Sequence, residues 1–180
     1  MRWLFVYFCV FSQSYSFYNK GMQSFIFFTN WALITTAIYM IVSINALRPK
    51  SSTSLLALHH ILFSFSLVMN IVVVSVYWPF LFKTDINRPE TKASWFRFIN
   101  CILTHSVPLL ASYYNYKTIY AVMKRSHCVS VIPLVTIYLF TNYRARWARG
   151  EPLYWFLTWE DKTSVAVVVL IYAATILLFN

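Results

Sequence analysis

The sequence has little charge: only 11% of its 180 residues are Asp, Glu, Lys or Arg. A soluble domain carries about 25% charged residues, so this chain cannot cover a water-facing surface with charge. Glycine is also scarce, with two residues, and no internal repeat or low-complexity segment is visible. In contrast, 59% of the residues are hydrophobic and 20% are aromatic. The composition therefore predicts a polytopic membrane protein and excludes a soluble enzyme.

Cysteine usage argues against a disulfide framework, because the number is odd and no CxxC spacing occurs: Cys9, Cys101 and Cys128 all lie in apolar surroundings. The net charge of +10 raises the question of nucleic acid, but the cations form short clusters between apolar runs and not a basic stripe. Such clusters are typical of loops that face lipid headgroups. We expect membrane lipids as partners, other membrane subunits as a further option, and no nucleic acid.

Six apolar runs predict six transmembrane helices, at about 3–18, 23–47, 55–82, 95–116, 128–143 and 164–180. Backbone polar groups must be satisfied inside lipid, and no alternating barrel pattern is visible, so the spans are expected to be helical. The first run also has the shape of a signal peptide, and its removal would leave five helices. We expect an all-α bundle in one membrane domain, residues 1–180, that crosses an endomembrane or the plasma membrane several times.

A polar pair interrupts the second apolar run: Thr29 and Asn30 lie between Phe28 and Trp31. Polar side chains in hydrocarbon are costly unless they are paired, so this pair marks a candidate site. The second candidate is His105 in the fourth run. Lys20 and Arg97 mark one membrane boundary, and Thr29 and His105 lie nine and eight residues past them, or about 12–13 Å along a helix. The spacing therefore predicts similar depth for the two side chains, but it does not predict contact.

A threonine hydroxyl needs an adjacent base to become a nucleophile, and a neutral histidine is the usual base. We therefore consider Thr29 as nucleophile and His105 as base. No acid falls in a span to orient the histidine, so Asn30 or Asn100, or Glu160 or Asp161 from a loop, would have to do so. Asn30, Trp31 and Asn100 are also candidates to bind substrate or an oxyanion. The simpler alternatives are a threonine bonded to its own helix and a histidine that bridges two helices.

Other polar residues in the runs favour structural roles. His59 and His60 are adjacent, so they point to different parts of a helix surface and make a poor metal pair; anchoring at the membrane interface is the favoured role. Asn70, at the centre of the third run, is expected to join helices by hydrogen bonds. No phosphate loop, haem pair, HExxH or GxSxG motif is present, so we expect no cofactor and no metal.

Four segments resemble one family. Residues 27–31 (Phe-Phe-Thr-Asn-Trp) resemble the second-helix signature of the rolling stone-like proteins, which belong with the androgen-induced integral membrane proteins. Residues 72–78 resemble the apolar run that closes the family's third helix on Tyr-Trp. The fourth run resembles the asparagine-and-histidine segment, and residues 150–159 are similar to the Gly…Tyr-Pro-x-Leu-x-Trp loop motif. Together these segments cover nearly the whole chain in the right order.

The resemblance implies a six-helix membrane protein. In the androgen-induced branch, it also implies an intramembrane threonine hydrolase that cleaves fatty acid esters of hydroxy fatty acids. Thr29 takes the position of the threonine in the second helix, and His105 is the best match for the histidine in the fourth. The rolling stone branch is linked to myoblast fusion, and shared helices need not mean shared chemistry. The alternative function is therefore non-enzymatic, in membrane fusion or as a small structural subunit of a larger membrane complex.

Overall fold

A computed structural model describes residues 1–119 and 122–179 of the protein, apart from the side chain of Glu90. The chain divides into two compact units, residues 1–122 and 123–180, where the sequence predicted one domain. Each unit is described by itself. Within the described residues, the only strand-like pairing is an isolated bridge between Tyr154 and Leu157. The helical content confirms the predicted all-α class.

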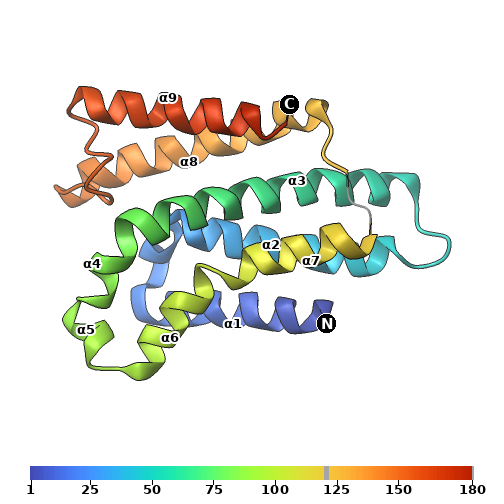
Figure 1. The fold of residues 1–180 in the computed structure, drawn as a ribbon, viewed down its shortest axis with the longest axis horizontal. Coiled ribbons are helices and arrows are strands. Elements are labelled where there is room, and N and C mark those ends of the chain that lie inside the picture. Colours follow the sequence, from blue (N-terminus) through green and yellow to red (C-terminus); the bar gives the residue numbers. More distant parts are fainter. Residues whose placement is uncertain (120–121, 180) are drawn as a thin grey trace. The chain divides into compact units, whose positions relative to one another are not determined.

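Unit 1 consists of long helices that run side by side and a short excursion at one end (Figure 1). Its elements, in chain order, are α1 (Arg2–Lys20), a 3₁₀ helix (Gly21–Ile26), α2 (Phe28–Ala46), α3 (Thr53–Val76), a π-helical turn (Tyr77–Leu81), α4 (Phe82–Ile86), α5 (Pro89–Lys92), α6 (Trp95–Thr104) and α7 (Val107–Ile119). Four of these helices, α1, α2, α3 and α7, pack against one another, whereas α4, α5 and the start of α6 form the excursion.

The second helix begins later than predicted, at Phe28 and not near residue 23. Gly21 ends α1 with φ +55°, a backbone conformation that favours glycine. The next residues, up to Ile26, then wind into a 3₁₀ helix, and the extended Phe27 starts α2. Thr29 is consequently the second residue of its helix.

The fourth predicted helix is broken in two. Pro108 has no N–H to donate to the Thr104 carbonyl one turn earlier, and its ring restricts the preceding backbone. The helix accordingly ends at Thr104 and resumes at Val107, which places His105 and Ser106 at the break. The kink that the sequence predicts at Pro108 therefore occurs just before this proline.

Unit 2 is a helical hairpin that follows a short 3₁₀ helix, Arg125–His127 (Figure 1). Helix α8 (Cys128–Arg149) is six residues longer than predicted and ends where Gly150 takes the left-handed conformation, at φ +75°. Helix α9 (Lys162–Leu177) begins two residues earlier than predicted, because the Asp161 carboxylate accepts a hydrogen bond from the Ser164 N–H, 2.8 Å away, and caps the helix. The predicted end of this helix, residue 180, lies outside the described residues.

Among the residues that the structure describes, three helical segments are long and apolar enough to cross a membrane: Phe28–Ala46, Thr53–Ile86 and Arg125–Arg149. A fourth apolar segment, Lys162–Leu177, is shorter. Its 16 residues measure about 24 Å as a helix, against a hydrocarbon core of about 30 Å. The three long segments support three of the six runs that the sequence predicted to be spans.

Hydrogen-bonded side chains, and not only apolar ones, fill the centre of unit 1. Thr36 Oγ1 lies 2.9 Å from Ser66 Oγ, and Ser66 Oγ lies 2.8 Å from Ser112 Oγ. The Asn70 amide donates to Thr36 Oγ1 at 2.8 Å and to the Ser66 carbonyl at the same distance. All four residues are buried, and they join α2, α3 and α7. We call them the middle layer; they confirm the expectation that Asn70 joins helices.

A second polar layer lies two turns further along α2, and we call it the far layer. The Asn115 amide donates to Ser43 Oγ at 3.0 Å, and Ser43 Oγ lies 3.0 Å from His59 Nδ1. Arg2 Nε donates to Asn115 Oδ1 at 2.7 Å, which ties α1 to α7. The expected interfacial role is wrong for His59, because this residue is only 3% exposed and is bonded inside the bundle.

Candidate functional site

Thr29 and His105 lie side by side in unit 1. Thr29 belongs to the first turn of α2, and His105 lies at the break between α6 and α7. Thr29 Oγ1 is 3.2 Å from His105 Nε2, which is within hydrogen-bonding distance. Both residues are half-buried, so the pair is not sealed inside the bundle. Two residues that are 76 positions apart, and that the sequence singled out separately, therefore form one polar contact.

The protonation of the imidazole follows from its second contact. His105 Nδ1 lies 2.7 Å from the backbone carbonyl of Cys101. A carbonyl oxygen only accepts, so Nδ1 carries the hydrogen. In the neutral ring Nε2 is then the lone-pair nitrogen, and the Thr29 hydroxyl donates to it. This is the arrangement in which a histidine accepts a proton from a nucleophile.

The aromatic ring of Tyr77 covers one face of the imidazole. The two ring centroids are 3.5 Å apart and the planes are inclined by 8°. Tyr77 is 1% exposed and starts the π-helical turn of the third segment, which also contains Pro79. Its hydroxyl lies 2.9 Å from Cys101 Sγ. Cys101 thus contacts both partners of the stack, through its carbonyl for His105 and through its sulfur for Tyr77.

The predicted depth match rested on a premise that the structure corrects. The residues between Lys20 and Thr29 do not form one continuous helix, since a 3₁₀ helix occupies Gly21–Ile26. Thr29 is therefore close to the start of α2, and His105 lies at the end of a ten-residue helix, α6. The contact depends on the break before Pro108 and on the late start of α2, two features that a count along ideal helices omits.

The other predicted site residues lie nearby, but two of them have different partners. The Asn30 amide donates to Ser16 Oγ at 3.0 Å and to the Ser24 carbonyl at 2.6 Å. The Trp31 indole N–H donates to the Phe25 carbonyl at 2.6 Å. These bonds hold the start of α2, where Thr29 lies, against α1 and the 3₁₀ helix.

Asn100 lies on α6 and is half-buried. It precedes His105 by five residues, which rotates it about 140° around a helix from the histidine. The sequence offered Asn30, Asn100, Glu160 and Asp161 as groups that could orient the His105 ring. In the structure, the backbone carbonyl of Cys101 accepts the hydrogen bond that orients it. Of these acids, Glu160 pairs with Arg146 at 2.5 Å, and Asp161 caps α9, so both are engaged within unit 2.

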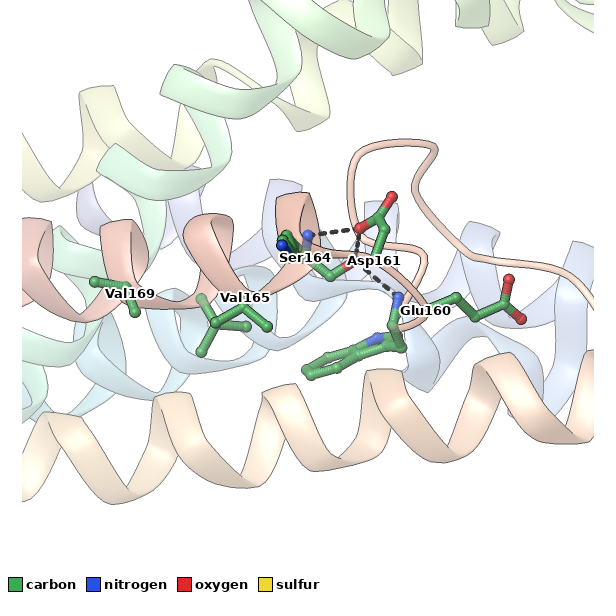
Figure 2. A pocket seen from close by; sticks show the side chains of 8 residues that line it. Glu160, Asp161, Ser164, Val165 and Val169 are labelled. Carbon is green, nitrogen blue, oxygen red and sulfur yellow. Dashed lines mark hydrogen bonds between the residues drawn. The ribbon is translucent and has the colours of Figure 1, made fainter.

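Each unit contains a cavity. In unit 1, a cavity of about 550 Å³ is lined by Gln13, Ser14, Phe17, Tyr18 and Phe25, from α1 and the 3₁₀ helix. In unit 2, a cavity of about 460 Å³ lies along the first turns of α9 (Figure 2). Neither cavity is lined by Thr29 or His105 themselves.

The unit 2 cavity is built around a helix start and not around a reactive pair. Figure 2 shows Asp161 hydrogen-bonded to Ser164, with Val165 and Val169 further along α9. The Ser164 N–H and hydroxyl bonds lower the pKa of the Asp161 carboxyl. Ser164 Oγ also accepts from the Trp159 N–H at 2.9 Å. These contacts are those of a helix cap.

No three His, Cys, Asp or Glu side chains of the described residues gather as metal ligands would. Comparison of the chain with protein-family models, with curated proteins and with solved structures finds no match. Any functional proposal must therefore rest on the geometry.

Two residues of the site were missed from the sequence. Tyr77 was noted only within the Tyr-Trp pair that closes the third run, and Cys101 only as a cysteine in apolar surroundings. The contact of Cys101 could have been predicted from the sequence, because in a helix the backbone carbonyl four residues before a histidine is within reach of its ring. The contact of Tyr77 with His105 could not have been predicted from the sequence, because spacing along the chain does not say which helices are neighbours.

Proposed function

We propose that this protein is an intramembrane hydrolase of lipid esters with Thr29 as nucleophile and His105 as general base. The observation that carries the proposal is the Thr29 Oγ1 to His105 Nε2 distance of 3.2 Å, together with the Nδ1 bond to the Cys101 carbonyl. This combination leaves the basic nitrogen facing the hydroxyl. Substrates are proposed to be esters of membrane lipids, such as fatty acid esters of hydroxy fatty acids.

In the first step, Thr29 Oγ attacks the ester carbonyl carbon while its proton moves to His105 Nε2. The tetrahedral intermediate collapses, and the histidine returns the proton to the departing alkoxide, which leaves as an alcohol. Water then attacks the acyl-threonine, with His105 again accepting and returning a proton. The products are a fatty acid and an alcohol, and the enzyme is regenerated. This sequence requires no metal or cofactor.

Two features of the site support the charges that this mechanism develops. Thr29 is in the first turn of α2, where backbone N–H groups lack intrahelical acceptors and the helix dipole favours negative charge; an oxyanion formed at Thr29 would lie near this end. The imidazolium would form between the Cys101 carbonyl and the face of Tyr77. An aromatic face attracts a cation, so the histidine can act without a carboxylate partner.

We further propose that the chain crosses the membrane six times, with α1 and the pair α6–α7 completing the set of spans. Helix α1 has 19 residues, or about 28 Å, and packs on α2, where Cys9 joins Leu33 and Ala37 in a buried cluster. Its tie from Arg2 to Asn115 on α7 favours a structural helix over a removed leader. The membrane is proposed to be an endomembrane or the plasma membrane.

The proposal is tested with purified protein in lipid nanodiscs. We expect Thr29→Ala to abolish both ester hydrolysis and covalent labelling by a fluorophosphonate probe, and Thr29→Ser to retain both. Thr35→Ala is the matched control, because Thr35 lies on the same helix and is also half-buried. His105→Gln should lose labelling while the protein still inserts. Hydrolysis that persists in Thr29→Ala would remove the proposal.

A further inference from the structure

The unit 2 cavity is apolar at one end and charged at the other. Three valines and three charged residues contribute to its lining: Val165, Val168, Val169, Glu160, Asp161 and Lys162. Figure 2 shows Val169, Val165, Asp161 and Glu160 in this order along the start of α9. A phospholipid separates its acyl chains from its charged headgroup in the same way, so the polarity of the cavity fits a single lipid molecule that lies along α9.

The apolar end of the cavity is accessible. Val165 and Val169 are 64% and 61% exposed, and they belong to a helix that we propose crosses the membrane. Apolar side chains on the outside of such a helix contact acyl chains and not water. The cavity volume of about 460 Å³ lies within the range of small-molecule sites, about 300–1,000 Å³. An acyl chain can therefore reach the valines directly from the bilayer.

The wall of the cavity at Trp159 is fixed by hydrogen bonds. The Trp159 indole N–H donates to Asn142 Oδ1 at 2.7 Å, and its backbone N–H donates to Ser164 Oγ at 2.9 Å. These bonds hold Trp159 in the left-handed region, at φ +67°. A wall that is already ordered loses little conformational freedom when a ligand binds. Tryptophan is also typical of the membrane boundary, where a headgroup would lie.

The charged end carries both signs. Glu160 Oε1 accepts from Arg146 at 2.5 Å, and the Glu160 side chain is still 54% exposed. Asp161 is engaged by the Ser164 N–H and hydroxyl, so the accessible charged groups are Glu160 and Lys162. A carboxylate and an ammonium so close together suit a headgroup that carries both a cation and a phosphate. An ethanolamine headgroup can donate N–H hydrogen bonds to a carboxylate, whereas a choline headgroup has no N–H.

We propose that the unit 2 cavity binds phosphatidylethanolamine, with the phosphate at Lys162, the ammonium at Glu160 and one acyl chain along the valines of α9. The cations Arg146 and Lys162 balance the two acids of this end, so a headgroup with net negative charge has no advantage there. The cavity contains neither Thr29 nor His105, and the inference is therefore independent of the hydrolase proposal.

The test measures lipid binding to the purified, delipidated chain in detergent. The probe is a phosphatidylethanolamine with a free amine and a photoreactive diazirine in one acyl chain, and labelled peptides are identified by mass spectrometry. We expect labelling within residues 159–169. Unlabelled phosphatidylethanolamine should compete about 5- to 10-fold better than phosphatidylcholine or phosphatidylglycerol with the same acyl chains, as one hydrogen bond between charged groups predicts.

Two carboxylates provide a matched pair for the headgroup. Glu160→Gln removes the charge but keeps an oxygen that accepts from Arg146, and with it phosphatidylethanolamine and phosphatidylcholine should compete equally. Glu151→Gln is the control, because Glu151 pairs with Arg149 at 2.7 Å in the same unit but lies outside the lining; it should keep the preference. Lys162→Met should weaken competition by both lipids about fivefold, since both carry the phosphate.

Neighbouring residues of α9 provide a matched pair for the acyl chain. Val169→Trp fills the cavity and should reduce labelling at least about fivefold. Leu170→Trp should not, because Leu170 is equally exposed, at 67%, and lies outside the lining. Thermal unfolding without lipid shows that each variant is folded, and both exposed positions should tolerate the change.

Three results would overturn the proposal. Stronger competition by phosphatidylglycerol than by phosphatidylethanolamine would indicate a site for anionic lipid. Equal competition by all three lipids, or labelling spread along the whole chain, would indicate a non-selective lipid shell. A preference for phosphatidylethanolamine that survives Glu160→Gln would remove this carboxylate as the recognition group.

Discussion

The contact between Tyr77 and His105 predicts a specific kinetic defect for Tyr77→Leu. The tyrosine ring lies parallel to the imidazole with centroids 3.5 Å apart, so in the proposed mechanism it faces the cation that forms when Thr29 loses its proton. Leucine fills part of the same space but has no aromatic face. The change therefore removes stabilisation of the imidazolium, which exists only in the transition state and the intermediates.

The magnitude follows from the geometry. A cation over an aromatic face is stabilised by about 0.5–1 kcal/mol when exposed and by about 2 kcal/mol when desolvated. Tyr77 is 1% exposed, so the upper part of this range applies, about 1–2 kcal/mol. Since about 1.4 kcal/mol is a factor of ten in rate, we expect kcat to fall roughly 5- to 30-fold. KM should change little, because the neutral ring in the ground state makes a weaker contact.

Tyr77→Phe is the matched control. It keeps the aromatic face and removes only the hydroxyl that contacts Cys101 Sγ at 2.9 Å, a bond worth about 0.5–1.5 kcal/mol in stability. We expect its kcat to stay within about threefold of the parent value. Both variants are assayed for ester hydrolysis in nanodiscs, and the folded fraction is measured by thermal unfolding so that rates refer to folded protein.

Two results would refute this account of Tyr77. If Tyr77→Phe lost as much activity as Tyr77→Leu, the hydroxyl and not the ring face would be the active element. If Tyr77→Leu kept the parent kcat while folded, the imidazolium would not depend on the stack. An effect confined to KM would indicate that the ring contacts substrate.

Three further predictions concern stability. Asn70→Ala should lower the free energy of unfolding by about 1–3 kcal/mol, because it breaks the middle layer. The control is Asn45→Ala, since the Asn45 amide bonds to its own helix, and it should lower the free energy of unfolding by less than about 0.5 kcal/mol. Equal losses in the two variants would contradict the role of the middle layer. Arg2→Met should loosen α1 and increase its cleavage by protease, whereas Arg48→Met should not. The cap bonds lower the pKa of Asp161. Its stabilisation of α9 is therefore present above an unfolded pKa of about 3.9 and is lost as the pH falls through the lower pKa of the folded state. Asp161→Asn keeps a capping side chain and should remove this loss at acid pH; a variant whose unfolding temperature falls with acid as steeply as that of the parent protein would contradict the prediction.

The sequence predicted the helical class because composition and run length determine it, but it placed several boundaries incorrectly. The start of α2 at Phe28 depends on the glycine conformation at Gly21 and on a 3₁₀ helix, and neither alters hydrophobicity. The division into two units was also not expected. Both result from local backbone geometry and tertiary contacts, which a hydropathy profile averages over.

The candidate pair was predictable because Thr29 and His105 are polar residues in apolar runs. Its orientation was not, because the orienting group is a backbone carbonyl, that of Cys101. Every residue has a carbonyl, so the sequence carries no mark of the one that is used. A search for a carboxylate partner of the histidine was therefore bound to miss it.

Spacing along α2 explains why the sequence could not rank its polar residues by function. Thr29, Thr36 and Ser43 recur every seven residues, which places them on one face of the helix. Each contacts a polar side chain from another helix or from a helix break, and two of the three contacts pair a hydroxyl with a histidine. What differs is access. Thr36 and Ser43 are fully buried, and each accepts a hydrogen bond from an asparagine amide in addition to its other contact, so their oxygens have little capacity left for a substrate carbon. Thr29 is half-buried, begins its helix and faces a histidine that is already fixed from its other side. Hydroxyl groups on one helix face therefore support packing at two positions, and the proposed mechanism uses the third as the nucleophile.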